Sequence, residues 1–322
     1  MIKGGVSTCL KFHVAAILLL ASSIFLRSNC ELTFLIHFST SMLKVDGKPF
    51  ENYLSFLMKT LERFISFKLR RKSMGSLKVG AQLIIWGAKP RENLKEVLDE
   101  VREAGYEGIE ASPEIFSTDT MRKRRLLLEN GLRLVALHMG VGNMEQVEQA
   151  ARLLETLEGE YLTFSGPGGK GLDEDYFKCA EFLNKAGQIS REHGVKTCYH
   201  NHGHEIADNQ KGIEIIIQNT EPELVGLCVD TYWVKFGGVD PLQFIKTNRE
   251  RIVYLHLKDG SEEDMKNKRF SELGKGSIEF PAILSFTAKL GVKWVVVEQD
   301  WTPGSPFKSM LESRDYLRKI GY

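Results

Sequence analysis

From Leu77 to the C-terminus, short apolar runs alternate with amphipathic stretches. The runs are rich in Val, Ile and Leu, and the stretches between them place apolar residues at helical spacing. Eight runs are predicted to be strands: residues 77–86, 106–112, 132–138, 161–166, 195–202, 224–230, 251–259 and 292–300. The stretches predicted to be helical are 90–104, 118–130, 144–157, 173–193, 210–220, a helix opening at Pro241, 280–290 and 308–319.

Proline and glycine mark several of the predicted helix ends. Pro90 suits a first helical turn, Gly105 suits a C-terminal cap, and Asp240 precedes Pro241 as an N-cap residue does. Eight strand–helix alternations with near-continuous apolar strands are typical of an α/β protein with a single (β/α)8 (TIM) barrel, here over residues 77–322. A doubly wound open sheet is the competing fold. It is disfavoured because no strand is followed by GxGxxG or a Walker loop, and the glycine-rich segment 166–171 lacks the GK[ST] ending.

Residues 1–73 form an N-terminal extension that differs from the rest of the chain. Met1 to Cys30 contain no acidic residue, and the apolar run 12–26 resembles a signal peptide but is short for a membrane span. The extension ends in a basic tract at 68–72 and a compositional change at Met74. It is interpreted as a targeting segment, a genuine extension, or a stretch translated ahead of a start at Met74. We favour the third interpretation, because no barrel element needs these residues.

Composition and charge change this picture little. The 322 residues are 43% hydrophobic and 26% charged with a net charge of +1, which gives no electrostatic reason to expect nucleic acid or an acidic membrane as a partner. The five cysteines are odd in number and show no CxxC spacing, so neither a disulfide framework nor a zinc–cysteine site is indicated.

Polar residues stand where the predicted strands end. In a barrel of this kind the C-terminal strand ends face the active site. The residues concerned are Glu110, His138, His200, His202, Asp230, His256, Lys258 and Glu298. One such residue is often a helix cap or a hydrogen-bonded neighbour. Four successive strands that each end in His, Asp or Glu are harder to explain in that way.

Carboxylates and imidazoles that meet at one rim are costly to desolvate unless they are paired or coordinated. The predicted metal ligands are His200 or His202, Asp230, His256 and Glu298, and strand alternation points the two histidines to the same side. A mixed N/O set suits one divalent ion per subunit, and Mn2+, Co2+, Fe2+, Zn2+ and Mg2+ all fit it better than a soft thiolate-binding metal does.

The segments YHNHGHE, ELVGLCVDTYWVKFGGVDP, YLHLKD, LGKGSIEFPAIL and VVVEQD resemble the sugar phosphate isomerase/epimerase family of xylose isomerase-like barrels. That family includes ketose 3-epimerases, inosose dehydratases and 3-keto-glycoside lyases, and is related to endonuclease IV. The resemblance covers residues 77–322. It implies one divalent ion, commonly Mn2+, held by His200, Asp230, His256 and Glu298.

The chain departs from the ketose epimerases at two positions. They have a glutamate where this chain has His200, and a histidine where it has Trp233. The resemblance implies that two opposed carboxylates serve as base and acid in those enzymes, and only Glu298 clearly remains here. Simple two-carboxylate 3-epimerisation is therefore disfavoured.

The expected chemistry is enolisation of a keto sugar, a sugar phosphate or a cyclic polyol through a metal-stabilised enediolate. Glu298, His200 or His202 is the candidate base, since a histidine is well matched to proton transfer near neutrality. The candidate proton donors or hydroxyl contacts are His138, Lys258 and Glu110. Trp233 is predicted either to stack on a sugar ring or to pack in the core.

Isomerisation or epimerisation is the first hypothesis, and lyase or dehydratase chemistry, favoured by His200, is the second. Endonuclease IV-like phosphodiester cleavage is remote, because it needs more metal ligands and a basic face. The expected partner is a small sugar or polyol, with no nucleic acid and no stable membrane partner, and a homo-oligomer is compatible with the sequence. The expected location is the cytoplasm, unless residues 1–30 act as a targeting signal.

Overall fold

The computed structural model describes residues 44–45, 48–49, 77–167 and 171–322. The signal-like segment 1–30 and the basic tract 68–72 lie outside the described residues. Before the barrel, β1 (Lys44–Val45) pairs antiparallel with β2 (Lys48–Pro49). No helix in the described ranges is long and apolar enough to cross a membrane.

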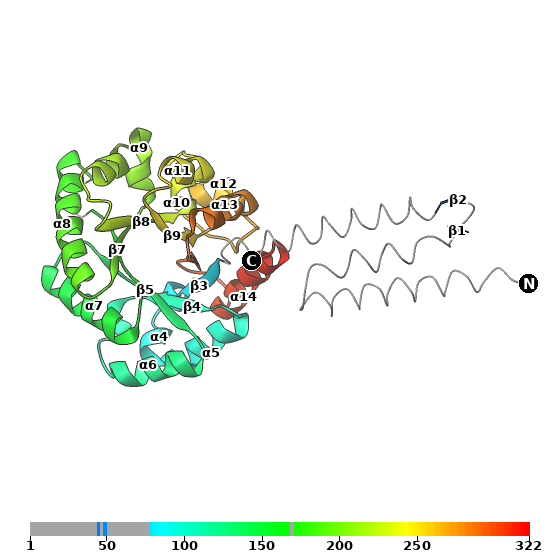
Figure 1. Ribbon diagram of the computed structural model, residues 1–322, viewed down its shortest axis with the longest axis horizontal. Coiled ribbons are helices and arrows are strands. Elements are labelled where there is room, and N and C mark those ends of the chain that lie inside the picture. The colour runs from blue at the N-terminus through cyan, green and yellow to red at the C-terminus, as the bar shows by residue number, and fades with distance from the viewer. Residues whose placement is uncertain (1–43, 46–47, 50–76, 168–170) are drawn as a thin grey trace, which may run out of the picture. The chain divides into compact units, whose positions relative to one another are not determined.

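Eight parallel strands close into a barrel in the order β10-β3-β4-β5-β6-β7-β8-β9, with helices around the outside (Figure 1). The predicted (β/α)8 architecture is thereby confirmed. The strands are β3 (Lys78–Gln82), β4 (Gly108–Ala111), β5 (Arg133–Gly140), β6 (Tyr161–Ser165), β7 (Lys196–His200), β8 (Val225–Asp230), β9 (Ile252–Leu257) and β10 (Trp294–Val297). Most strand positions are fully buried, as expected when helices cover the outer face and side chains fill the interior.

The helices that follow the strands lie mostly where the sequence predicts them. The α-helices are α4 (Lys89–Glu92), α5 (Leu94–Ala104), α6 (Thr120–Glu129), α7 (Met144–Leu157), α8 (Asp173–Glu192), α9 (Gly203–Gln218), α10 (Thr231–Phe236), α11 (Pro241–Thr247), α12 (Glu262–Lys266), α13 (Phe280–Thr287) and α14 (Pro306–Lys319). The 3-10 helices are η1 (Leu83–Trp86), η2 (Pro113–Ile115) and η3 (Ala288–Leu290).

The predicted caps explain several of these ends. Gly105 ends α5 in a left-handed conformation at φ 84°, which costs glycine little. Asp240 accepts a hydrogen bond from the Gln243 amide at 2.7 Å and so starts α11. The last helix, α14, packs beside α5 and closes the outer layer. The Tyr106 hydroxyl, just after α5, donates a hydrogen bond to the Met310 carbonyl on α14 at 2.7 Å.

Four elements differ from the prediction. The run 77–86 leaves the strand after Gln82 and turns into η1, because the Gln82 side chain accepts the Ile84 amide at 2.9 Å and caps it. The helix predicted at 210–220 begins earlier, at Gly203, and its backbone leaves helical geometry at residues 207–210. The short helices α10 and α12 were not predicted.

The interior of the described barrel is apolar except at the carboxyl ends of its strands. Cys198 on β7 and Cys228 on β8 are buried free thiols, as expected for small hydrophobic residues, and Cys179 on α8 is buried as well. Glu110, His200, Asp230, His256 and Glu298 are buried polar side chains at the carboxyl ends of the strands, and that end carries the candidate site.

Candidate metal centre

Four side chains from the last four strands meet at the carboxyl-terminal rim. His200 ends β7, Asp230 ends β8, His256 is the penultimate residue of β9, and Glu298 directly follows β10. One donor atom from each lies within 4.8 Å of the others, and all four side chains are buried. Adjacent parallel strands bring these positions together, since Asp230 and His256 are direct register partners.

The donor atoms of this cluster lie close together without forming hydrogen bonds. His200 Nε2 lies 3.4 Å from Asp230 Oδ2 and 3.5 Å from Glu298 Oε2, and His256 Nδ1 also contacts Glu298 Oε2. All of these atoms are buried and lack a hydrogen-bond partner among the described residues. Buried polar atoms are normally satisfied, so an unsatisfied N/O set that converges on one point fits a divalent cation.

The charges of the cluster also favour a cation. Burial would raise the pKa of Glu298, but Lys258 and His256 hold it well below its ordinary value, so the carboxylate is ionised. Burial would lower the pKa of His200, but Asp230 and Glu298 raise it above its ordinary value. Without an ion, a proton on His200 balances part of the charge of the two carboxylates. A bound divalent ion would supply that positive charge itself and would displace the proton.

Glu110 lies beneath the cluster, fully buried at the end of β4. Its Oε2 lies 2.9 Å from His256 Nε2 and 2.8 Å from the Tyr254 hydroxyl, and its Oε1 lies 2.9 Å from His138 Nδ1. The Gln82 amide reaches the same Oε1 at 3.4 Å. Both oxygens are thus engaged by protein side chains, and the substrate contact predicted for Glu110 stays a prediction.

His138 connects this lower layer to the cluster. Its Nδ1 lies against Glu110, its Nε2 lies 3.0 Å from the Ser165 hydroxyl, and its ring centroid is 5.0 Å from that of His200. Burial lowers the pKa of His138 despite its carboxylate partner. The imidazole is therefore neutral near pH 7, and its predicted catalytic role remains a prediction.

The two histidines of the YHNH motif lie in different places. Strand alternation predicted that His200 and His202 point to the same side, but β7 ends at His200 and His202 begins the next helix. The His202 ring stands 5.1 Å from that of His200 and lines a neighbouring cavity, outside the four-atom cluster. Burial and the nearby His200 lower the pKa of His202 to about 2, so this imidazole is neutral.

Lys258 and Trp233 border the cluster on the rim side. Lys258 Nζ contacts Asp300 Oδ1 at 2.5 Å and lies 3.6 Å from Glu298 Oε1. The same ammonium lies over the rings of Phe270 and Trp233, 4.4 and 5.2 Å from their centroids. Burial would lower the pKa of Lys258, but Glu298 and the nearby aspartates raise it, so a fixed positive charge faces the Glu298 carboxylate.

Asp259 of the HLKD motif holds a turn together, away from the cluster. Its carboxylate accepts backbone amides from Gly260 at 2.8 Å and from Gly274 at 2.9 Å, with further amides from residues 276–278. A Cβ at Gly276 would lie 2.1 Å from an oxygen of this carboxylate, which explains the second glycine of LGKGS. This part of the resemblance is therefore structural.

Sequence reasoning missed three residues that position the site. Tyr254 lies two residues before His256 on β9, so strand alternation would have shown that both face inward. Asn201 accepts the Asp230 amide at 3.0 Å and fixes the start of α10. Phe270 covers Lys258 from a loop, and a loop residue of this kind gives no periodic signal.

Comparison with known proteins agrees with this geometry. The profile of the xylose isomerase-like TIM barrel family matches residues 98–320. An inosose dehydratase from Geobacillus kaustophilus is 23% identical over 297 residues, covering 77% of this chain and 96% of that protein.

Solved structures share the fold. A sugar phosphate isomerase/epimerase from Parabacteroides distasonis superposes with a TM-score of 0.64 at 21% identity, over 75% of this chain and 93% of that one. The IOLI protein, solved with a bound zinc atom, gives a TM-score of 0.62 at 17% identity, over 76% of this chain and 98% of that one.

Proposed function

The chain belongs to the xylose isomerase-like TIM barrel family, and we propose that it is a divalent-metal-dependent isomerase or epimerase of a keto sugar, a sugar phosphate or a cyclic polyol. The observation that carries this proposal is the convergence of four buried donor atoms, from His200, Asp230, His256 and Glu298, that have no hydrogen-bond partner among the described residues. The relatives named above are sugar- and polyol-processing enzymes, which supports an enzyme of the same general class.

The ligand set proposed is His200 Nε2, Asp230 Oδ2, His256 Nδ1 and Glu298 Oε2. Asp230 leaves Oδ2 free because its Oδ1 accepts the Trp233 amide at 2.8 Å. A bound divalent ion would supply Lewis acidity toward a substrate carbonyl. Mn2+ is our first choice, and the zinc bound by the IOLI protein makes Zn2+ the first alternative.

Glu298 is the proposed base. Its Oε2 belongs to the ligand set, while its Oε1 faces Lys258 at 3.6 Å and is the oxygen left for proton transfer. Glu298 takes the proton from the carbon next to the carbonyl, the C–H electron pair forms the C=C bond, and the carbonyl π electrons move to the oxygen, which gives the enediolate. Return of this proton to the former carbonyl carbon, with transfer of the hydroxyl proton to the former carbonyl oxygen, gives an isomer. An epimer forms only if a second donor delivers a proton to the opposite face of the original carbon while Glu298 keeps the one it took.

Dehydration is the second candidate, and two observations favour it. His200 stands where the ketose epimerases have a glutamate, so a second carboxylate base is missing from the ligand set. The curated relative named above is also a dehydratase. Elimination needs one base and an acid that protonates the departing hydroxyl. The Lys258 ammonium, 3.6 Å from Glu298 Oε1, is the candidate acid.

Incubation with keto hexoses and with an inosose in deuterated water tests the proposal. We expect solvent deuterium at the carbon next to the carbonyl, with loss of exchange in Glu298→Gln and after chelation. Exchange without loss of water supports the isomerase, and an unsaturated product supports the dehydratase. Exchange that survives both chelation and Glu298→Gln would refute the metal-dependent mechanism.

A further inference from the structure

We propose that the cavity beside the cluster binds a second, neutral ring of the substrate, which makes the substrate a two-ring glycoside instead of a free monosaccharide. This inference rests on the proposed function and names its substrate class. The cavity has a volume of about 330 Å3, and its lining includes His202, His204, Trp233, Phe236 and Lys268. Its volume lies at the lower end of the range for ligand pockets, about 300 to 1,000 Å3.

The cavity begins one side chain away from the proposed ligands. The His202 ring lines it and also packs 5.1 Å from the His200 ring. Trp233 lines it as well, and its backbone amide donates to Asp230. The cavity is therefore close enough to the cluster for one substrate to place a reacting ring at the cluster and a second, directly attached ring in the cavity.

The walls of the cavity are the flat faces and edges of rings. Trp233 and Phe236 meet edge to face with centroids 5.2 Å apart, and His202 and His204 stack at 6.0 Å with an interplanar angle of 15°. Phe236 is 37% exposed, so an aromatic side chain is offered to a ligand. Rings of this kind bind the apolar face of a sugar or an aromatic ring.

The charges at the cavity argue against a phosphate group. Among the described residues that line it, Lys268 is the one lysine or arginine, and these include no aspartate or glutamate. The helix that starts at the cavity is also poorly suited to anion binding. The Glu205 carboxylate already accepts the His202 amide at 2.9 Å, and helical geometry ends at Ala207. A neutral ring fits these features better than a phosphate.

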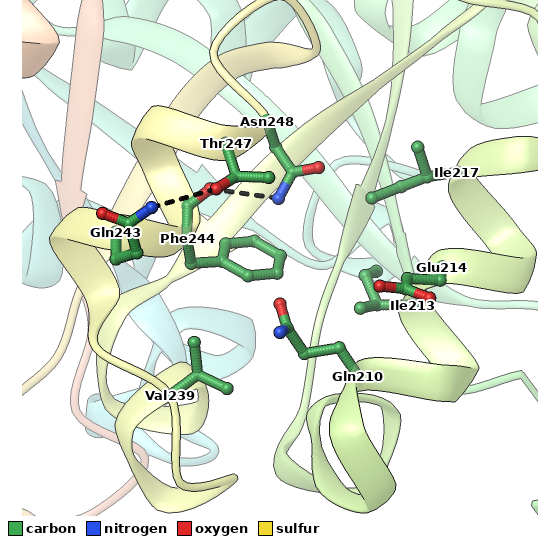
Figure 2. A pocket seen from close by; sticks show the side chains of 9 residues that line it. All are labelled: Gln210, Ile213, Glu214, Ile217, Val239, Gln243, Phe244, Thr247 and Asn248. Carbon is green, nitrogen blue, oxygen red and sulfur yellow. Dashed lines mark hydrogen bonds between the residues drawn. The ribbon is translucent and has the colours of Figure 1, made fainter.

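A second cavity in the described part of the chain lacks these features. Figure 2 shows it between α9 and α11, with Ile213, Ile217 and Phe244 among its lining residues. Its volume is about 110 Å3, too small for a sugar ring with its hydroxyl groups, and none of its lining residues belongs to the cluster. We therefore place the second ring at the rim cavity.

The first test measures kcat/KM for deuterium exchange on 3-keto-glucose, its phenyl β-glycoside, 3-keto-cellobiose and 3-keto-glucose 6-phosphate. The two-ring substrates should exceed 3-keto-glucose at least tenfold. Phe236→Ala should lower the two-ring to one-ring ratio about fivefold. Phe236→Tyr should restore the ratio. The matched control is Phe177→Ala, an exposed phenylalanine on α8 that does not line the cavity, and it should leave the ratio unchanged.

The two glycosides distinguish an aromatic second ring from a sugar. Equal kcat/KM for one-ring and two-ring substrates, or a preference for the phosphate that Lys268→Gln abolishes, would overturn the inference while leaving the proposed function standing.

Calorimetry with phenyl β-glucoside on metal-free protein separates the two proposals. If no substrate shows exchange, the proposed function fails. The inference about the cavity then stands if Phe236→Ala weakens glucoside binding and Phe177→Ala does not. It fails if the wild-type protein binds no glucoside, or if both variants bind it equally well.

Discussion

Replacing Glu110 by glutamine should weaken metal binding although Glu110 is not a proposed ligand. Burial would raise the pKa of Glu110, but His256 and His138 hold it below its ordinary value, so the group is a carboxylate that only accepts hydrogen bonds. It lies 2.9 Å from His256 Nε2, which must therefore donate. The Nδ1 atom of His256 faces the cluster, so a bound ion would take the place of its proton while Nε2 keeps its own proton for Glu110.

The size of the effect follows from these contacts. Loss of a carboxylate that orients a metal-binding histidine typically lowers metal affinity 10- to 100-fold, which corresponds to about 1.4 to 2.7 kcal/mol. The NH2 group of the glutamine would also face one of the three groups that now donate to the carboxylate, on His138, Tyr254 and His256, so that two donors would oppose each other. One buried donor left without a partner costs a further ~1–3 kcal/mol in the free energy of unfolding.

Titration calorimetry with Mn2+ and Zn2+, together with urea unfolding of the metal-free protein, measures both quantities. Leu154→Ala on α7 is the control. This substitution in the buried core should cost about 2 to 5 kcal/mol in stability and leave metal affinity unchanged. The reasoning is wrong if Glu110→Gln binds both ions as tightly as the wild type, or if the control loses as much affinity as Glu110→Gln does.

Three further predictions concern separate features. In elemental analysis, His200→Ala should lose the bound metal and His202→Ala should retain it, and the reverse result would make His202 the ligand. His193 has a raised pKa because its glutamate partners outweigh burial, so its contribution is present below pH 6.5 and disappears as pH rises through the raised value. His193→Gln should therefore cost about 0.5 kcal/mol more at pH 5.5 than at pH 9 in urea unfolding, and an equal cost at both would contradict this. A Cβ at Gly108 would lie 2.8 Å from a valine methyl group, so Gly108→Ala should cost about 1 to 3 kcal/mol, while Gly142→Ala, with open space around it, should be neutral in thermal unfolding.

Much of the barrel could be predicted because its signals are local. Strands buried on both faces appear as apolar runs, and helix ends carry their own caps, as Gly105 and Asp240 do. The short helices α10 and α12 escaped prediction because five or six residues do not complete two helical turns of apolar spacing. The turn after Gln82 escaped because one side-chain hydrogen bond outweighs the apolar character of the run.

The candidate site was less predictable than the barrel, for a physical reason. Strand ends show which residues share the rim, but alternation fixes side-chain direction only while the strand continues. His202 lies beyond that limit, so its direction depends on the start of α9. The position of Glu110 beneath the cluster depends on how β4 faces β9 across the barrel interior, and contacts across the interior leave no periodic trace in the sequence.

His200 is the residue that most constrains the chemistry. With two imidazoles and two carboxylates, the proposed ligand set would carry the charge that balances one divalent ion, whereas a glutamate at this position would leave an excess negative charge. With His200 in place of the epimerase glutamate, one face of the substrate would have no carboxylate base. We therefore propose that Glu298, with its partner Lys258, acts from the other face. A single base can move a proton between neighbouring carbons or start an elimination. Inversion of one carbon needs a proton donor on the opposite face, and the neutral His202 ring beside the cluster is not acidic enough for that role. The geometry thus favours isomerisation or dehydration over two-carboxylate epimerisation.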